Sequence, residues 1–320
     1  MTLLGRRAMM TDAYETTRQT PGGLSIPAAA GRTLEIVSAV AAMGLLVLNA
    51  ALPEDRNDAG RAALDTVPAA FAPGPETVLG AYLGAPYHYP SDFHLKNGST
   101  TDLTIKDVEW FTQPFKNPLY YGARIQRWMA GGVFGTMIDF THSKAYAPFQ
   151  QEKTFQGTLD GKPVPDKAKV ENYFDKLEFS HGHNMLTFNG LMRVFRFGPV
   201  WPYAGLGAGV SLPHSEIHSL ADPARTYEYQ YTGLNAQALF GLEFRLKTGS
   251  VFLEYKFTTA DYMAPITHRD GSWLPIDMWH QFSRWWSGAK PPGGWASTRL
   301  TSHQVIGGFY VRFAPQVTAQ

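Results

Sequence analysis

The stretch RLTSHQVIGGFYVRF, Arg299–Phe313, decides the fold that we expect for this chain. Its residues alternate, so a strand places Val305 and Phe309 on one face and Gln304 and Arg312 on the other. An apolar outer row with a polar inner row is typical of outer-membrane β-barrels, because lipid contacts the outer face and side chains fill the interior. A half-buried strand of a soluble sheet alternates in the same way, so the other strands must decide between the two folds.

The composition narrows the class of protein. The chain has 320 residues, a net charge of +1 and scattered basic residues, which argues against nucleic acid as a partner. The absence of cysteine excludes disulfides, thiolate metal sites and cysteine nucleophiles. Aromatic residues make up 13% of the chain and there are 31 glycines, which favours strands with aromatic girdles over a helical enzyme.

The first part of the chain has the pattern of an export region. An apolar run, Ile36–Leu48, follows Arg32 and ends in small residues, as in a secretory signal peptide. An uncleaved anchor helix is the alternative interpretation, although the run is short for a membrane span. We expect an N-terminal extension with this signal-like segment over residues 1–51, a linker over 52–76, a barrel over 77–313 and a tail over 314–320.

From Thr77 onward, alternating runs are separated by turns, and no long helical period is present. If Thr101–Met129 is merged into one long strand interrupted by prolines, eight strands result, an even number as a closed antiparallel barrel requires. Short turns near Gly131, Gly198 and Thr248 alternate with four long connections. This rhythm predicts an all-β fold: a closed antiparallel transmembrane barrel with long outer loops, surrounded by the lipids of a Gram-negative outer membrane.

Charged residues gather on the face opposite each apolar row. A charge that faces lipid at the midplane costs about 2–4 kcal/mol, so these side chains should point inward and pair. We expect most of them to form a structural ion-pair network inside a barrel that is too narrow to conduct. They are Arg124, Asp139, Arg193, Glu243, Arg245, Glu254, Lys256 and Arg312.

All ten histidines fall at the outer ends of the predicted strands or in the outer loops. Imidazole suits metal ligation and proton transfer near neutral pH. His181 and His183 are two residues apart, so a regular strand places them on one face. Asp139, His142 and Glu178 lie at neighbouring strand ends, which makes a shared nitrogen and oxygen metal site possible. For any single histidine, a hydrogen-bonded rim residue is the simpler interpretation.

Two other chemistries find less support. A serine hydrolase such as a lipid A deacylase needs serine and histidine on one face, but neither His-x-Ser nor Ser-x-His occurs. The adjacent Ser180 and His181 should point to opposite faces, which leaves only a cross-strand pair. The run GLGAGV at Gly205–Val210 alternates along a strand and precedes no helix, so the chain has no flavin or nicotinamide motif.

Six segments together resemble the outer-membrane lipid A oxidase family of rhizobia-like bacteria. They are LYYGARIQRWM (119–129), GTMIDFTHSKAYAP (135–148), KLEFSHGHNMLTFNGLMRVFRF (176–197), PYAGLGAGVSLPHSEI (202–217), TYEYQYTGLNAQALFGLEF (226–244) and FLEYKFT (252–258). The resemblance covers residues 77–313. It implies oxidation of the proximal glucosamine of lipid A, the anchor of lipopolysaccharide, to 2-aminogluconate with molecular oxygen and release of hydrogen peroxide.

The resemblance and the chemistry together suggest a set of site residues. Lipid A sugars lie at headgroup level, so an integral enzyme should hold its catalytic groups at the outer rim, and amino acids alone do not activate oxygen. We therefore predict a divalent metal ion of unknown identity, with Glu254 as a base and Asp139 or His142 as supplementary ligands. The predicted catalytic residues are Asp139, His142, Lys144, Glu254 and Lys256; the substrate-binding residues are Asn184, Asn189, His214, Tyr229 and Gln230; the metal ligands are His181 and His183. The alternative is a structural or adhesive barrel without enzymatic activity.

Overall fold

The computed structural model describes residues 75–193, 195–222, 224–246, 249–271 and 273–313. The expected signal-like extension over residues 1–51, the linker up to residue 74 and the tail over residues 314–320 lie outside the described residues. No helix in the described ranges is long and apolar enough to cross a membrane.

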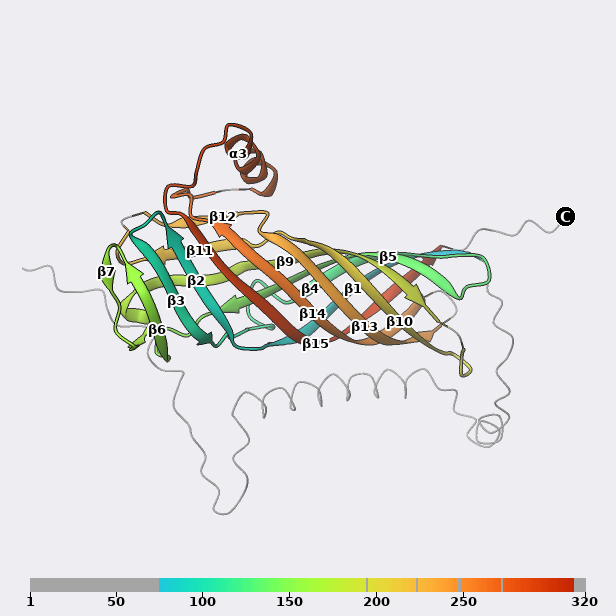
Figure 1. Ribbon diagram of the computed structural model, residues 1–320. Coiled ribbons are helices and arrows are strands. Elements are labelled where there is room, and N and C mark those ends of the chain that lie inside the picture. The colour runs from blue at the N-terminus through green and yellow to red at the C-terminus, as the bar shows by residue number, and fades with distance from the viewer. Residues whose placement is uncertain (1–74, 194, 223, 247–248, 272, 314–320) are drawn as a thin grey trace, which may run out of the picture.

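Eight antiparallel strands close into a ring, because the last strand pairs with the first (Figure 1). Thr77 lies opposite Phe313 and His88 opposite Ser302 in that closing pair. The predicted closed barrel and its closing strand are therefore confirmed. In ring order the strands are β1 (Glu76–His88), β4 (Tyr121–Trp128), β5 (Phe134–Tyr146), β9 (Phe174–Met192), β10 (Val200–Ser211), β13 (Gly233–Arg245), β14 (Gly249–Pro265) and β15 (Trp295–Phe313).

The connections at one end of the ring form additional strands that extend the same sheet instead of open loops. We call these strands the outer extension. The first residues of β15, Trp295–Ser297, pair with β2, and β2 pairs in turn with β3. The merged strand predicted over Thr101–Met129 is wrong: its first part pairs with β2 and β6 in the extension, and only its last part enters the ring. Pro114 and Pro118 lie between the two parts, where the missing N–H groups interrupt a ladder. The extension comprises β2 (Ser91–Asn97), β3 (Thr101–Val108), β6 (Glu152–Leu159), β7 (Lys162–Pro163), β8 (Lys167–Lys169), η1 (Val170–Asn172), β11 (His214–Ser219) and β12 (Thr226–Tyr229).

One helix was not expected from the sequence. Helix α3, Leu274–Trp286, lies within the last of the four long connections, for which we predicted an outer loop. Its apolar residues recur at helical spacing and Pro275 stands in its first turn, where a proline loses no hydrogen bond.

The outer face of the ring carries an apolar band. On β15, Phe309 and Val311 are exposed, while Ile306 and Tyr310 between and beside them are buried. Exposed charges on the ring strands, such as Arg127 and the Asp261–Arg299 pair, lie toward the ends of the band, so the outer face suits lipid, as in an outer-membrane barrel. Other exposed members of the band are Leu79, Leu83, Ile125, Phe134, Ile138, Phe188, Leu206, Leu234 and Phe240.

The interior holds the predicted ion-pair network. Arg124 lies 3.0 Å from Asp139 and 2.8 Å from Glu254, and Lys256 lies 2.6 Å from Asp139. All four side chains are fully buried. The extension, in contrast, has an apolar core of its own, formed by residues such as Phe93, Leu103, Ile105, Phe155, Phe174, Leu177 and Ile217.

Candidate functional site

A β-bulge near the outer end of β9 separates two histidines that a regular strand would keep together. Ser143 pairs with His183, but the next pair joins Ala145 to Phe179, so β9 carries extra residues there. Gly182 within the bulge has φ +147°, a conformation that favours glycine. As a result His183 is fully buried while half of the His181 side chain is exposed. The expectation that both share one face is therefore wrong, because a bulge changes the alternation of side chains.

His181 instead meets two residues of β11. One ligand atom each from His181, His214 and Glu216 lies within 4.8 Å of the other two, the one such group of three among the described residues. Nδ1 of His181 is 2.6 Å from Oε1 of Glu216, and Nδ1 of His214 is 3.4 Å from the same oxygen. We call these three side chains the rim cluster. Two imidazoles and one carboxylate make a donor set that fits a divalent transition-metal ion.

Electrostatics keep Glu216 ionised. Burial raises its pKa, but hydrogen bonds from His214, Ser180 and His181 outweigh burial and lower the pKa to about 2. The neighbouring Glu178, opposite Glu216 in the β9–β11 pair, behaves differently: burial raises its pKa above the ordinary value. The carboxylate of Glu216 is thus the charged partner of the histidines at neutral pH.

Two tyrosine rings form an aromatic wall on one side of the rim cluster. The ring of His214 packs edge-on against Tyr227 at 4.4 Å and against Tyr229 at 4.7 Å between ring centroids. Tyr227 also packs on His181. Sequence reasoning named Tyr229 but missed Glu216 and Tyr227. The spacing His-x-Glu on β11 could have identified Glu216, since residues two apart on a strand share a face.

His142 lies opposite Asn184 in the β5–β9 pair, toward the outer end of β5. Its Nδ1 is 2.8 Å from Oδ1 of Asn184, and Nδ2 of Asn184 donates to the carbonyl of Leu212 at 3.1 Å. This second bond fixes the amide orientation, so Nδ1 of His142 carries the proton and Nε2 is left with a lone pair. Nε2 has no hydrogen-bond partner within the described ranges. Asn184 is three residues from His181 along β9, so this hydrogen bond connects His142 to the strand that carries the rim cluster.

The other predicted site residues lie elsewhere. His183 faces the lumen, where it hydrogen-bonds the Tyr262 hydroxyl and packs against His88 at 5.4 Å. Asn189 accepts a hydrogen bond from Gln237 at 2.7 Å inside the barrel. The structure therefore brings His181, His214 and Tyr229 together in one group and His142 and Asn184 in another. Asp139, Glu254 and Lys256 belong to the interior network. Lys144 donates to the carbonyl of Lys116, and Gln230 donates to that of Pro265.

Ser180 also contacts the rim cluster, contrary to the expected opposite orientation of Ser180 and His181. Its Oγ lies 3.0 Å from Nδ1 of His181 and donates to Glu216 at 2.5 Å. In a serine triad the base uses one ring nitrogen for serine and the other for the acid. Here serine and acid meet the same nitrogen, so the geometry does not activate Ser180.

We predict that Ser180→Ala leaves fatty acid release from lipid A at background and retains metal binding at the rim cluster. The substitution removes one hydrogen bond to Glu216, worth about 1–3 kcal/mol, without removing a ligand. Acyl-chain release and bound metal in the purified variant measure this. A wild-type hydrolytic activity that disappears with Ser180 would contradict the interpretation.

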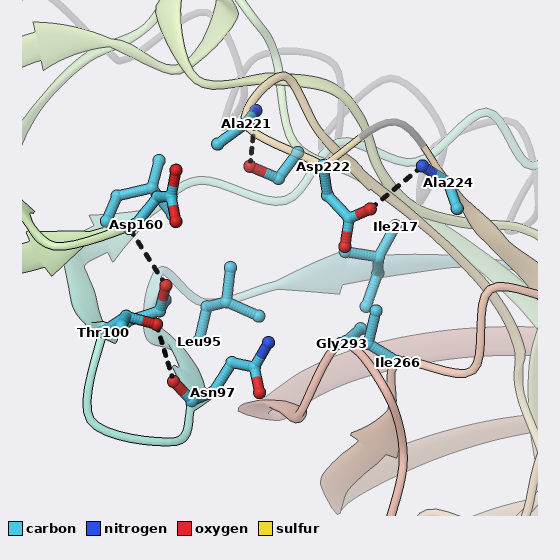
Figure 2. A pocket seen from close by; sticks show the side chains of 13 residues that line it. Leu95, Asn97, Thr100, Asp160, Ile217, Ala221, Asp222, Ala224, Ile266 and Gly293 are labelled. Atoms are coloured by element: carbon cyan, nitrogen blue, oxygen red, sulfur yellow. Dashed lines mark hydrogen bonds between the residues drawn. The ribbon is translucent and has the colours of Figure 1, made fainter.

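A separate cavity of about 130 Å³ lies in the extension (Figure 2). Ile217 lines it from β11, next in sequence to Glu216, whose side chain joins the rim cluster instead. Asp222 is at its wall, 2.6 Å from Nε2 of His268. Apolar and small residues form most of the remaining lining, so the cavity lacks the donor set that the rim cluster has.

The ring, the apolar band and the paired interior define a transmembrane β-barrel of the outer-membrane class. No family model matches the sequence, and no curated protein matches it. Similar solved structures include Neisserial surface protein A, with 11% identity over 76% of this chain and 99% of that protein, at a TM-score of 0.32. OprG from Pseudomonas aeruginosa has 12% identity over 76% and 98%, at 0.37, and the outer-membrane protease OmpT from Escherichia coli 10% over 74% and 97%, at 0.36.

Proposed function

We propose that this protein is an outer-membrane lipid A oxidase whose active site is the rim cluster together with His142. The observation that carries the proposal is the meeting of His181, His214 and Glu216 at the outer end of the barrel wall. Two histidines and one carboxylate with open positions are the donor set of non-haem iron enzymes that use oxygen. The resemblance of the sequence to lipid A oxidases supports the same chemistry.

The position of the cluster suits a lipid substrate. Short turns lie at the end of the ring where β1 begins, and the extension lies at the other end, which is the outer one in barrels of this class. The cluster residues on β9 and β11 lie where the ring meets the extension. A lipid A molecule in the outer leaflet holds its sugars at this height, so its proximal glucosamine can reach the cluster from the side.

The reaction requires C1 of that glucosamine to be a free hemiacetal. Loss of the C1 hydrogen and the hydroxyl proton with two electrons yields a lactone, oxygen takes up both electrons and two protons to become hydrogen peroxide, and water opens the lactone to the acid. A redox-active divalent ion held by the rim cluster would supply the path for the electrons to oxygen. The bare Nε2 of His142 accepts the hydroxyl proton, and Tyr227 and Tyr229 form an aromatic wall for the sugar.

The test is a direct assay with folded protein. Wild type, loaded with ferrous, manganous or cobaltous ion, is incubated with lipid A that lacks the 1-phosphate, with and without oxygen. We expect the lipid to gain the mass of one oxygen atom, with one peroxide released per turnover and no reaction under argon. A matched variant, His94→Ala, removes an exposed histidine that bonds Thr104 on the extension and should react normally.

The outcomes separate the competing functions. Unchanged lipid A with every metal would refute the oxidase and favour the structural or adhesive barrel. Release of fatty acid without peroxide would identify a deacylase instead. Loss of activity in His142→Ala with metal content retained, and partial rescue by added imidazole, is the result expected if His142 is the proton acceptor.

A further inference from the structure

Helix α3 presents an aromatic face that none of the described residues covers. Trp279, Phe282 and Trp286 recur at helical spacing, and Trp285 lies beside them. Their exposed fractions are 65%, 47%, 76% and 72% in that order. The ring of Phe282 lies 5.9 to 6.0 Å from the rings of all three tryptophans, so the four side chains form one patch.

The other side of the helix is held by polar contacts. The buried carboxylate of Asp277 accepts a hydrogen bond from the backbone N–H of Tyr229 at 3.1 Å. The Gln281 side chain accepts from the N–H of Tyr231 at 2.8 Å and donates to its carbonyl at 2.7 Å. These bonds fix the rotation of the helix about its axis. The aromatic patch therefore points away from the protein, and Figure 1 shows α3 outside the barrel wall, next to β12.

The attachment point is continuous with the lipid-facing band of the barrel. Tyr231, which Gln281 holds, is exposed and precedes β13, whose outward row starts with the exposed Leu234. The exposed Met263 of β14 is joined to the same connection, because its N–H donates to the carbonyl of Thr232 at 2.7 Å. Apolar surface thus continues from the barrel wall to the foot of α3.

Residue types on α3 fit a membrane interface better than a protein surface. Tryptophan is enriched where headgroups meet acyl chains, because its ring is apolar and its N–H is polar. The flank of the helix between the patch and Asp277 carries Ser283, His280 and Arg284, which suit headgroups and water, beside the exposed Ile276. A short helix with this division lies in the interface plane instead of spanning the bilayer.

We propose that α3 is an interfacial helix whose aromatic patch inserts into the outer leaflet of the membrane that surrounds the barrel. The occupant of the patch is the boundary between lipid headgroups and acyl chains. Through Asp277 the helix is also attached to β12, which carries Tyr227 and Tyr229. This inference rests on the exposed patch and the band, not on the proposed reaction.

The absence of cysteine allows a clean test. Trp285→Cys and, as a second reporter, Trp279→Cys are labelled with an environment-sensitive dye in the full-length protein. His280→Cys, exposed on the polar side of the same helix, is the matched control. Each protein is folded into phosphatidylcholine vesicles that contain lipids spin-labelled in the upper acyl chain, and heat-modifiable gel mobility confirms folding.

We expect a blue shift of the emission and strong quenching by the spin-labelled lipids at positions 285 and 279, with neither at position 280. Soluble iodide should quench in the reverse order. Equal iodide quenching at all three positions would refute the proposal. A blue shift that grows with the protein-to-lipid ratio, without quenching by the spin-labelled lipids, would also refute it. That outcome would mean that the patch contacts a second copy of this chain.

Discussion

Replacement of His181 and His214 together by alanine is expected to remove bound metal and lipid A oxidation while the barrel still folds. The two imidazoles supply two of the three ligand atoms of the rim cluster, and both lie outside the packed interior network. We expect metal affinity to fall by more than about 100-fold. Loss of a residue that only hydrogen-bonds a ligand already lowers affinity by up to about 100-fold, and this variant removes two ligands themselves. Metal analysis of the refolded protein and the peroxide assay measure the two effects.

His183→Ala is the matched control for this double variant. It removes a histidine that is two residues from His181 in sequence but contacts Tyr262 and His88 on the other side of the wall. Metal content close to that of wild type is expected. If the double variant kept its metal, or if only His183→Ala lost it, the metal site would have to be assigned to the lumen and not to the rim cluster.

Arg124→Met is expected to destabilise the barrel by about 3–5 kcal/mol, because it leaves buried charges without their partner. The Arg124 guanidinium bonds both Asp139 and Glu254, and all three side chains have no exposed surface. Lys256 remains as a partner of Asp139, but Glu254 then keeps only neutral donors such as the Tyr203 hydroxyl at 2.6 Å. Urea unfolding in lipid vesicles measures the free energy of unfolding.

Arg127→Met, on the same strand, provides the comparison. Arg127 is exposed and donates to Thr77 at 2.8 Å, so its loss should change the free energy of unfolding by no more than about 0.5 kcal/mol. Activity per folded molecule should persist in Arg124→Met if the network is structural. If Arg124→Met instead kept its stability and lost its activity, Asp139 and Glu254 would be assigned a catalytic role, as first predicted.

The ring and its orientation could be predicted because they depend on a local rule. Alternation with a period of two residues sorts side chains between lipid and lumen on each strand, and Phe309 and Ile306 obey it. Helix α3 escaped prediction because four aromatic residues in a Trp/Pro/Gly-rich segment look the same in a loop. The strand over Thr101–Met129 failed because its division depends on which partner strands are available, not on the segment itself.

The candidate site was only partly accessible from sequence. The family resemblance named His181 and His214, yet their meeting with Glu216 requires β11 to pair with β9 across about 35 residues. The pairing of β9 with β11 cannot be predicted from the sequence pattern of either strand alone.

The amino-acid sequence by itself determined the class of fold, the direction in which each strand faces lipid and the need for a paired interior, because these follow from the cost of placing charges in lipid. Only the tertiary structure decided which histidines act together. The bulge at Gly182 turns His181 to the outside and leaves His183 inside, and the β9–β11 pairing brings His214 and Glu216 to His181. The extra residues of a bulge reassign a side chain to the other face, and the pairing of the strands sets where the bulge occurs.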